Sequence, residues 1–280
     1  MPELLIVGGL TVDRFPDGRR APGGSVLHAA VAASGEGVRP ATATVAGDEP
    51  EARAGLERLR GMGEVVVQAS PRTTTYAHSE HDGRRVLVLE ASSDPIAPAT
   101  LSPLPAADVA LFAPIADELP AAAIHELRAR LRPRLTVLLI QGWLRRLVVG
   151  EPVHPLPLAD VERDVWDAFA LADAVVVSTE DITETPGDPF AQALDVRGRL
   201  GPGPILVVTL GSEGYLLDDP RAPRIVASVP RTVVRDVPTV GAGDTFGAAL
   251  ALHLGRGRDP VAAAEAATER VIAVLEGRRS

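Results

Sequence analysis

The stretch Asp236-Val-Pro-Thr-Val-Gly-Ala-Gly-Asp-Thr-Phe-Gly247 decides how the rest of the chain is interpreted. It precedes the alanine- and leucine-rich residues 248–254, so it predicts a loop that turns into a helix. The Gly-Ala-Gly segment 241–243 has almost no side chain, which leaves its backbone N–H groups free to face a ligand. Because the first N–H groups of a helix lack internal partners and carry partial positive charge, this turn predicts an anion-binding site.

Asp244 lies in the middle of this predicted anion site. We expect the positive potential to keep its carboxylate ionised, and a base beside a bound phosphate is what phosphoryl transfer to a hydroxyl requires. Two other interpretations are open. The small residues form only a tight turn with an acid in the first helical turn, or Gly241, Gly243 and Gly247 belong to a dinucleotide-binding fingerprint. The fingerprint needs a βαβ unit, and no strand is predicted after Gly247.

The composition limits the classes of protein to which the chain can belong. The chain has 280 residues, enough for one large α/β domain or two small ones, and its net charge of −9 argues against binding to nucleic acid or an anionic membrane. It contains no cysteine, which excludes disulfides and thiolate chemistry and favours a cytoplasmic protein. The first residues, Met-Pro-Glu-Leu-Leu-Ile-Val, predict a strand and not a signal peptide, and no apolar run reaches the length of a membrane span.

Apolar runs typical of buried strands alternate with helical patterns along most of the chain. This alternation predicts a parallel α/β sheet, whose binding sites lie beyond the carboxyl ends of the strands. The predicted strands are 4–7, 41–46, 65–68, 108–112, 136–140, 174–177, 205–209, 215–217 and 225–227, and the predicted helices are 25–33, 50–60, 119–131, 160–170 and 260–275. Asp82-Gly83, between the β-rich runs 73–78 and 85–90, predicts a hairpin.

Residues Thr239-Val-Gly-Ala-Gly-Asp-Thr-Phe246 resemble the C-terminal signature of the ribokinase-like (PfkB) family of sugar, polyol and nucleoside kinases, Asp-Thr-x-Gly-Ala-Gly-Asp. The chain departs from that pattern at Pro238, where the family has Asp. The resemblance extends in order over the whole chain. It implies a single domain, residues 1–280, with a three-layer architecture in which helices flank a mostly parallel central sheet. It also implies a small β lid, from about residues 10–22 and 72–90, that covers the acceptor site and makes a homodimer contact.

The N-terminal part also resembles the family, in a strand that ends in glycine, an Asp a few residues later and Gly-Gly at the start of a helix. The resemblance implies that Asp13, Gly23 and Gly24 hold the hydroxyl groups of the acceptor. His28 stands where the family has Asn, and we assign it to the same site. From the residues alone, Asp13 can equally be a turn residue and His28 an ordinary helix residue.

The turn Gln141-Gly-Trp-Leu-Arg-Arg146 follows a strongly apolar predicted strand. It resembles a family turn that carries an Arg, which implies that Arg145 or Arg146 steadies a phosphate or the substrate; we assign Arg145 to substrate binding. The alternative is a solvated arginine pair.

The segment Ser178-Thr-Glu-Asp181 follows the next predicted strand. It resembles the family motif Asn-x-x-Glu, which implies that Glu180 and Asp181 organise Mg²⁺ near the phosphates. The same residues also suit a helix start, in which Ser178 is the cap and the acids favour the helix dipole.

The segment Leu210-Gly-Ser-Glu-Gly-Tyr215 resembles the family turn Thr-x-Gly-x-x-Gly, where the phosphates and ribose of the nucleotide lie. An ordinary strand–turn–strand hairpin is the alternative, and alanines at helical spacing near the family's adenine pocket, 264–268, also suit a core. The resemblance assigns these residues to nucleotide binding: Thr209, Gly211, Ser212, Gly214, Thr239 and Thr268.

Together these motifs predict a phosphotransferase that moves the γ-phosphate of ATP, with Mg²⁺, to a hydroxyl of a sugar, cyclitol or other polyol, or nucleoside. Asp244 takes the acceptor proton, and the N–H groups of Ala242, Gly243 and Asp244 hold the developing charge. The short lid and the turn at Gln141 favour an inositol-like polyol or a sugar over a nucleoside. A non-catalytic ligand-binding sensor with the same fold is the alternative, and its motivation is the set of departures from the family pattern: His28, Gln141, Trp143, Ser178, Asp181 and Pro238.

Overall fold

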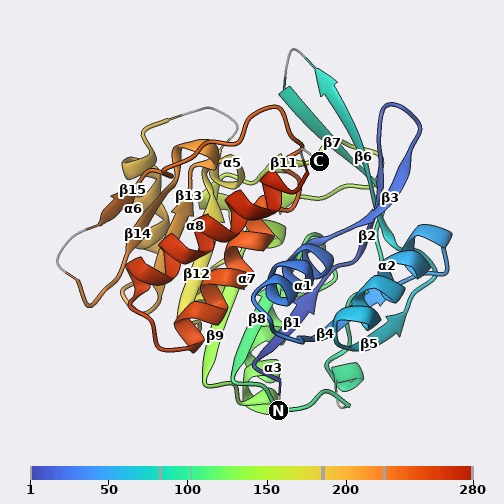
Figure 1. Ribbon diagram of the computed structural model, residues 1–280, viewed down its shortest axis with the longest axis horizontal. Helices are drawn as coiled ribbons and strands as arrows, with labels where there is room; N and C mark the ends of the chain where they lie inside the picture. Colours follow the sequence, from blue (N-terminus) through green and yellow to red (C-terminus); the bar gives the residue numbers. More distant parts are fainter. Residues whose placement is uncertain (1, 82–83, 102, 184–186, 223–224, 279–280) are drawn as a thin grey trace.

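A nine-stranded sheet forms the centre of the molecule, with strand order β15-β14-β13-β12-β9-β8-β1-β4-β5 (Figure 1). The computed structural model describes residues 2–81, 84–101, 103–183, 187–222 and 225–278. Seven strands are parallel: β1 (Leu4–Gly8), β4 (Ala41–Ala46), β5 (Glu64–Ala69), β8 (Val109–Ala113), β9 (Leu135–Leu139), β12 (Ala174–Ser178) and β13 (Ile205–Thr209). Two antiparallel strands complete one edge: β14 (Tyr215–Asp218) and β15 (Val226–Ser228). The predicted α/β class with a mostly parallel sheet is confirmed.

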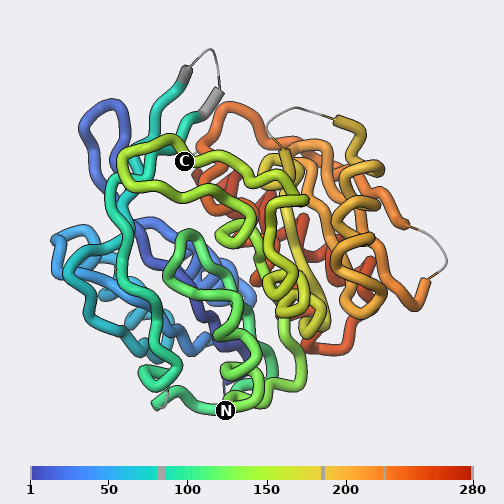
Figure 2. The backbone as a smooth tube through the Cα atoms, turned by 180° about the vertical axis from the view of Figure 1, so that it is seen from behind, coloured from blue at the N-terminus to red at the C-terminus, as the bar shows by residue number. Residues whose placement is uncertain are grey.

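Helices cover both faces of this sheet, so the architecture has three layers (Figures 1 and 2). Successive residues of β1 explain why both faces need cover: Leu4 and Ile6 belong to one apolar cluster and Leu5 and Val7 to the other. One face is covered by α1 (Ser25–Gly35), α2 (Pro50–Met62), α7 (Ala242–Gly255) and α8 (Pro260–Glu276). The other is covered by α3 (Ala121–Leu131), α4 (Arg163–Phe169) and α6 (Pro189–Leu200).

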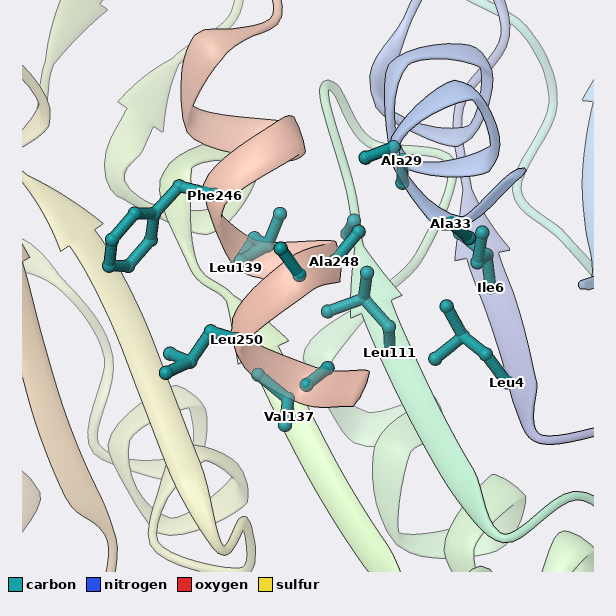
Figure 3. Packing of buried hydrophobic residues seen from close by; sticks show 14 of the residues in the cluster. Leu4, Ile6, Ala29, Ala33, Leu111, Val137, Leu139, Phe246, Ala248 and Leu250 are labelled. Atoms are coloured by element: carbon teal, nitrogen blue, oxygen red, sulfur yellow. The ribbon is translucent and has the colours of Figure 1, made fainter. Parts of the chain in front are cut away.

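Helix α7 lies in the middle of its layer and packs against α1, α8, β8 and β9. Every residue from Asp244 to Gly255 is buried. In Figure 3, Ala248 and Leu250 of this helix lie in the same apolar cluster as Leu111 and Leu139 of the sheet. At Gly247 a Cβ atom would overlap the side chain of Leu139, so glycine lets the helix approach the sheet closely. The N-terminus of α7 therefore lies at the carboxyl ends of the central strands.

A second sheet of four strands, in the order β3-β2-β6-β7, stands beyond these carboxyl ends (Figure 1). We call it the lid; its strands are β2 (Thr11–Arg14), β3 (Arg20–Gly23), β6 (Thr74–His81) and β7 (Arg84–Ala91). They lie in the two segments from which the sequence predicts a lid. The predicted hairpin turn Asp82-Gly83 lies outside the described residues.

The edge of the lid at β7 is covered by residues 150–153. The N–H of Gly150 donates to the carbonyl of Leu89 at 2.7 Å, and the N–H of Val153 donates to the carbonyl of Leu87 at 2.8 Å. Figure 2 shows the yellow-green segment after β9 running to the lid strands. Its two short strands, β10 (Arg145–Arg146) and β11 (His154–Pro155), pair as an antiparallel ribbon. This cover removes an exposed strand edge.

Most predicted element bounds agree with the structure to within a few residues. The helix predicted over 160–170 is shorter, because a 3₁₀ turn, η3 (Leu158–Asp160), precedes it and Val161 is extended. Among the described residues, no helix is both long and apolar enough to cross a membrane.

We expect Leu111→Ala, in the centre of β8, to lower the free energy of unfolding by about 2–5 kcal/mol, because it opens a cavity between α7 and the sheet. Leu194→Ala on α6 is the matched control: this leucine is 59% exposed, and we expect a change within about 0.5 kcal/mol. Urea unfolding followed by circular dichroism measures both. Equal losses in the two variants would contradict the assigned core.

Candidate active site

The turn that opens α7 leaves room for a ligand at its second residue. Gly241 has φ +78° and caps the helix, and a Cβ atom there would overlap the ring of His28. Both facts make glycine the residue that fits. At Gly243, in contrast, a Cβ atom would meet no described atom within 4 Å. The backbone of Gly243 therefore faces open space, while Gly241 is packed against α1.

Two backbone N–H groups at this turn have no hydrogen-bond partner among the described residues, those of Gly243 and Asp244. The third, from Ala242, donates to the carbonyl of Thr239 at 3.0 Å. The N–H of Thr245 donates to the carbonyl of Gly241 at 2.9 Å. The three-amide anion site expected from the sequence is thus reduced to two amides, because Ala242 closes the turn instead.

Asp244 is buried, with 7% of the residue exposed, at the first turn of α7. Its Oδ1 accepts a hydrogen bond of 3.2 Å from Nε2 of Gln141. Burial raises the pKa of Asp244 to about 6; the charge of Arg145 and the Gln141 hydrogen bond oppose this rise, and the charges of Asp181 and Asp13 add to it. Loss of solvation therefore outweighs the favourable charges, although a carboxylate with a pKa of about 6 is still mostly ionised at neutral pH.

Arg145 connects Asp244 to the end of the neighbouring strand. Its guanidinium contacts Oδ1 of Asp181 at 2.7 Å and lies 3.5 Å from Oε1 of Gln141. The side chains of Arg145 and Asp181 are only 16% and 7% exposed. The contact follows from topology: Gln141 and Arg145 follow β9, Asp181 follows β12, and these strands are hydrogen-bonded neighbours. We call Asp181, Arg145, Gln141 and Asp244 the polar relay.

Glu180 and Asp181, the residues assigned to Mg²⁺, have different surroundings. Asp181 is buried and paired with Arg145, whereas Glu180 is exposed. They lie on the short helix α5 (Thr179–Ile182), which Ser178 caps by accepting the N–H of Glu180 at 3.3 Å. No cluster of three or more acidic, His or Cys side chains suited to a metal occurs in the described part of the chain. Mg²⁺ keeps several waters in protein sites and uses one or two carboxylates together with substrate phosphates. Glu180 and Asp181 therefore still fit such a site.

Asp13 lies on lid strand β2 and is buried, with 6% of the residue exposed. Its Oδ1 accepts a hydrogen bond of 3.0 Å from the hydroxyl of Thr11. A Cβ atom at Gly23 would overlap the Asp13 carboxylate, and Gly24, with φ +96°, lies against the carbonyl of Gly9. Since the charge of Asp13 also acts on Asp244, the structure brings these two carboxylates into one site. His28 of α1 packs against Gly241.

The turn after β13 is a 3₁₀ turn, η4 (Gly211–Glu213), and Ser212 on it is exposed. Gly211 and Gly214 have φ +59° and +104°, respectively, and a Cβ atom at Gly214 would overlap the carbonyl of Ser228. Gly214 thus permits the close β14–β15 pairing, whereas Gly211 faces open space. Thr209 ends β13 beside Ser178 of β12.

The remaining two residues assigned to nucleotide binding, Thr239 and Thr268, differ in whether their side chains are free to contact a ligand. Thr239 is exposed, and its carbonyl closes the α7 turn. The hydroxyl of Thr268 donates to the carbonyl of Ala264 within α8 at 3.0 Å, so it is engaged inside the helix. Arg278 holds this loop by donating to the carbonyls of Pro238 and Val240 at 2.6 and 3.0 Å.

The sequence profile of the pfkB family of carbohydrate kinases matches residues 8–270. The chain belongs to this family. No curated protein sequence matches the chain.

Solved structures of kinases share this family's fold. One is a pyrophosphate-dependent kinase in the ribokinase family, complexed with a pyrophosphate analog and myo-inositol; it is 20% identical, the match covers 98% of this chain and 95% of that chain, and the TM-score is 0.79. Another is a ribokinase from Arabidopsis thaliana complexed with ribose and ATP, at 16% identity, 98% and 93% coverage and TM-score 0.73. A fructokinase from Vibrio cholerae O395 in apo form has 21% identity, 99% coverage of each chain and TM-score 0.70.

Two residues at this pfkB-family site were missed from the sequence. Gln141 counted only as a departure from the family pattern, although its place directly after a predicted strand was a usable signal. Glu118 is fully buried, and no pattern in the surrounding sequence indicated a role for it. It accepts the N–H groups of Ile115 and Ala116 at 2.7 and 2.8 Å, and burial raises its pKa to about 7. The loop it holds accepts the hydroxyl of Tyr76 from the lid at 2.7 Å, through the carbonyl of Ile115.

We expect Arg145→Met to raise the pKa of Asp244 above about 6, because the positive charge that favours its ionised form is lost. It should also lower stability by about 3–5 kcal/mol, since Asp181 stays buried without its partner. Carbon-13 NMR of the aspartate carboxyls against pH measures the first effect and urea unfolding the second. The control is Arg146→Met, at the exposed neighbour, and a titration of Asp244 that is the same in both variants would contradict the relay.

Proposed function

We propose that this chain transfers the γ-phosphoryl group of ATP, with Mg²⁺, to a hydroxyl group of a sugar or cyclitol. The observation that carries the proposal is the position of Asp244: a buried carboxylate with a pKa of about 6 beside two helix N–H groups that have no partner in the described part of the chain. A general base works best when its pKa lies near the working pH. Family membership supports a kinase with a hydroxyl acceptor.

In the proposed reaction, Asp244 accepts the proton of the acceptor hydroxyl as its oxygen forms a bond to the γ-phosphorus. The bond from that phosphorus to the bridging oxygen breaks, and ADP leaves with the electron pair. Gln141 orients the carboxylate, and the charge of Arg145 favours its ionised form. The N–H groups of Gly243 and Asp244 hold the charge that develops on the phosphoryl oxygens.

Glu180 and Asp181 would hold Mg²⁺ through its waters, and the ion supplies charge neutralisation on the phosphates. The nucleotide itself is assigned to the edge of the site at β13, the η4 turn and the loop before α7. Its proposed contacts are Thr209, Gly211, Ser212, Gly214, Thr239 and Thr268.

Pyrophosphate is a second donor to test. The structural neighbour complexed with myo-inositol is described as pyrophosphate-dependent, whereas the ribokinase neighbour is complexed with ATP. Both donors end in a phosphoryl group that the two amides can hold. Assays with each donor at equal concentration therefore separate them, and we expect ATP to be used.

On the acceptor side, Asp13, Gly23 and Gly24 are proposed to bind hydroxyl groups, with His28 and Arg145 at the walls of the site. The lid would exclude water, which otherwise competes for the phosphoryl group. We place the reaction in the cytoplasm and expect a homodimer through the lid. Such a dimer would use the β3 edge or the outer face of the lid, because residues 150–153 cover the β7 edge.

A ligand-binding sensor with this fold remains the alternative. It has no use for a buried base beside a phosphate site, so the effect of one side chain on turnover separates the two. A thermal-shift screen of sugars, cyclitols and nucleosides with an ATP analogue and Mg²⁺ identifies the acceptor, since a ligand of the folded state raises the melting temperature.

We expect Asp244→Asn to lower kcat by about 10² to 10⁴, because the amide cannot accept the proton, while ATP binding is kept. The wild-type rate should rise with pH through about 6 as Asp244 loses its proton. ADP release in a coupled assay measures turnover, and calorimetry measures ATP binding. Asp195→Asn, at an exposed aspartate of α6, is the control. Wild-type turnover in Asp244→Asn would refute the role of the base.

We expect EDTA to abolish turnover and Mg²⁺ to restore it. In Glu180→Gln the Mg²⁺ concentration for half-maximal rate should rise about ten-fold, because a carboxylate near the ion is lost. A substitution at Glu180 tests the metal site more directly than one at Asp181, because removal of Asp181 would also break its ion pair with Arg145. Glu162→Gln, at an exposed residue before α4, is the control; identical Mg²⁺ curves for the two variants would exclude Glu180 from the metal site.

A further inference from the structure

His78 lies on the inner face of the lid, two residues beyond Tyr76 on β6. Tyr76 is the register partner of Asp13 on β2, so all three side chains share one face of the sheet. The His78 side chain is only 8% exposed, and its Nε2 is 3.5 Å from Oδ1 of Asp13. This Nε2 has no hydrogen-bond partner among the described residues.

The ring of His78 is held in place without the use of Nε2. Phe15 stacks on it with 4.9 Å between ring centroids and 20° between planes. The guanidinium of Arg19 lies 3.9 Å from the centroid of the Phe15 ring. A buried nitrogen that is fixed in position and has no hydrogen-bond partner among the described residues is suited to a polar ligand atom.

Three other polar side chains on this face of β2 and β6 are already engaged by the protein, and Glu80, near the end of β6, is exposed to solvent. The hydroxyl of Thr11 donates to Asp13, that of Thr74 donates to Ser93, and that of Tyr76 donates to Ile115. The β7 residues opposite His78 and Tyr76 are Leu87 and Leu89, which form no hydrogen bonds through their side chains. On this part of the lid, Asp13 and His78 are therefore the groups left for hydroxyl recognition.

We propose that His78 is a specificity-determining residue that binds the acceptor together with Asp13 and selects a pair of adjacent hydroxyl groups. The proposal rests on the proposed kinase function. The carboxylate oxygens of Asp13 accept hydrogen bonds, and an N–H at Nε2 of His78 donates one. The two residues together can therefore accept a hydrogen bond from one hydroxyl group and donate one to another. Because Nε2 of His78 and Oδ1 of Asp13 are 3.5 Å apart, each can contact one of the two neighbouring oxygens of a gauche vicinal diol. The acceptor class is then a polyol with vicinal hydroxyls.

The test uses His78→Leu, His78→Asn and the control Ser79→Ala, at the exposed neighbour on the opposite face of β6. The probes are myo-inositol, D-ribose and D-fructose, with 2-deoxy-D-ribose as the analogue that lacks one vicinal hydroxyl. Calorimetry without donor gives acceptor affinity, and the coupled assay gives KM for acceptor and donor. Thermal melts show that each variant is folded.

We expect His78→Leu to weaken the binding of the best acceptor by about ten-fold or more, with the KM for ATP unchanged. His78→Asn, which keeps a donor, should lose less, and Ser79→Ala should match the wild type. The preference for ribose over deoxyribose should shrink in His78→Leu, an effect that a purely structural role would not produce.

Wild-type affinity and wild-type preference in a folded His78→Leu would overturn the proposal, and so would a wild-type protein that binds none of the polyols. Failure of the kinase function appears differently. If the wild type binds a polyol but releases no ADP or phosphate with it, the kinase proposal fails, and the loss of that binding in His78→Leu still supports the role of His78.

Discussion

The structure depends on the burial of α7 up to its first turn. This helix is surrounded by α1, α8, β8 and β9, so its N-terminus ends at the carboxyl edge of the sheet and not in bulk water. Gly241 lies against His28, and Gly243 faces open space. The consequence is that a carboxylate and two backbone N–H groups without described partners share a poorly solvated site. Charges interact strongly in such surroundings, which explains both the raised pKa of Asp244 and the suitability of the site for phosphate.

The polar relay offsets part of the free-energy cost of burying the Asp244 carboxylate. A buried carboxylate needs hydrogen bonds and opposite charge nearby. Gln141 supplies the hydrogen bond, and Arg145 supplies the charge while it is itself paired with Asp181. The relay joins the ends of β9 and β12 to α7, and two of its members, Gln141 and Arg145, belong to the segment that continues to the lid edge at β7. The surroundings of the proposed base and the position of the lid are therefore parts of one continuous structure.

The lid, in turn, carries the proposed acceptor groups on its inner face. Asp13 comes from β2 and His78 from β6, and the loop held by the buried Glu118 receives Tyr76 from the same face. The proposed acceptor groups thus come from the lid, and the proposed phosphate site comes from the first turn of α7.

What the sequence by itself determined was local: the alternation of strands and helices, the parallel sheet, the glycine turn before α7 and the segments that build the lid. The first three follow from side-chain period and turn chemistry, which act over a few residues, whereas the lid segments follow from the resemblance to the pfkB family. Only the tertiary structure decided which side chains meet. Gln141 and Asp244 are 103 residues apart, the amide of Ala242 is used inside its own turn, and the pKa of Asp244 is set by how completely it is buried. Such contacts depend on strand order and on the packing of distant elements, and local patterns carry no information about either.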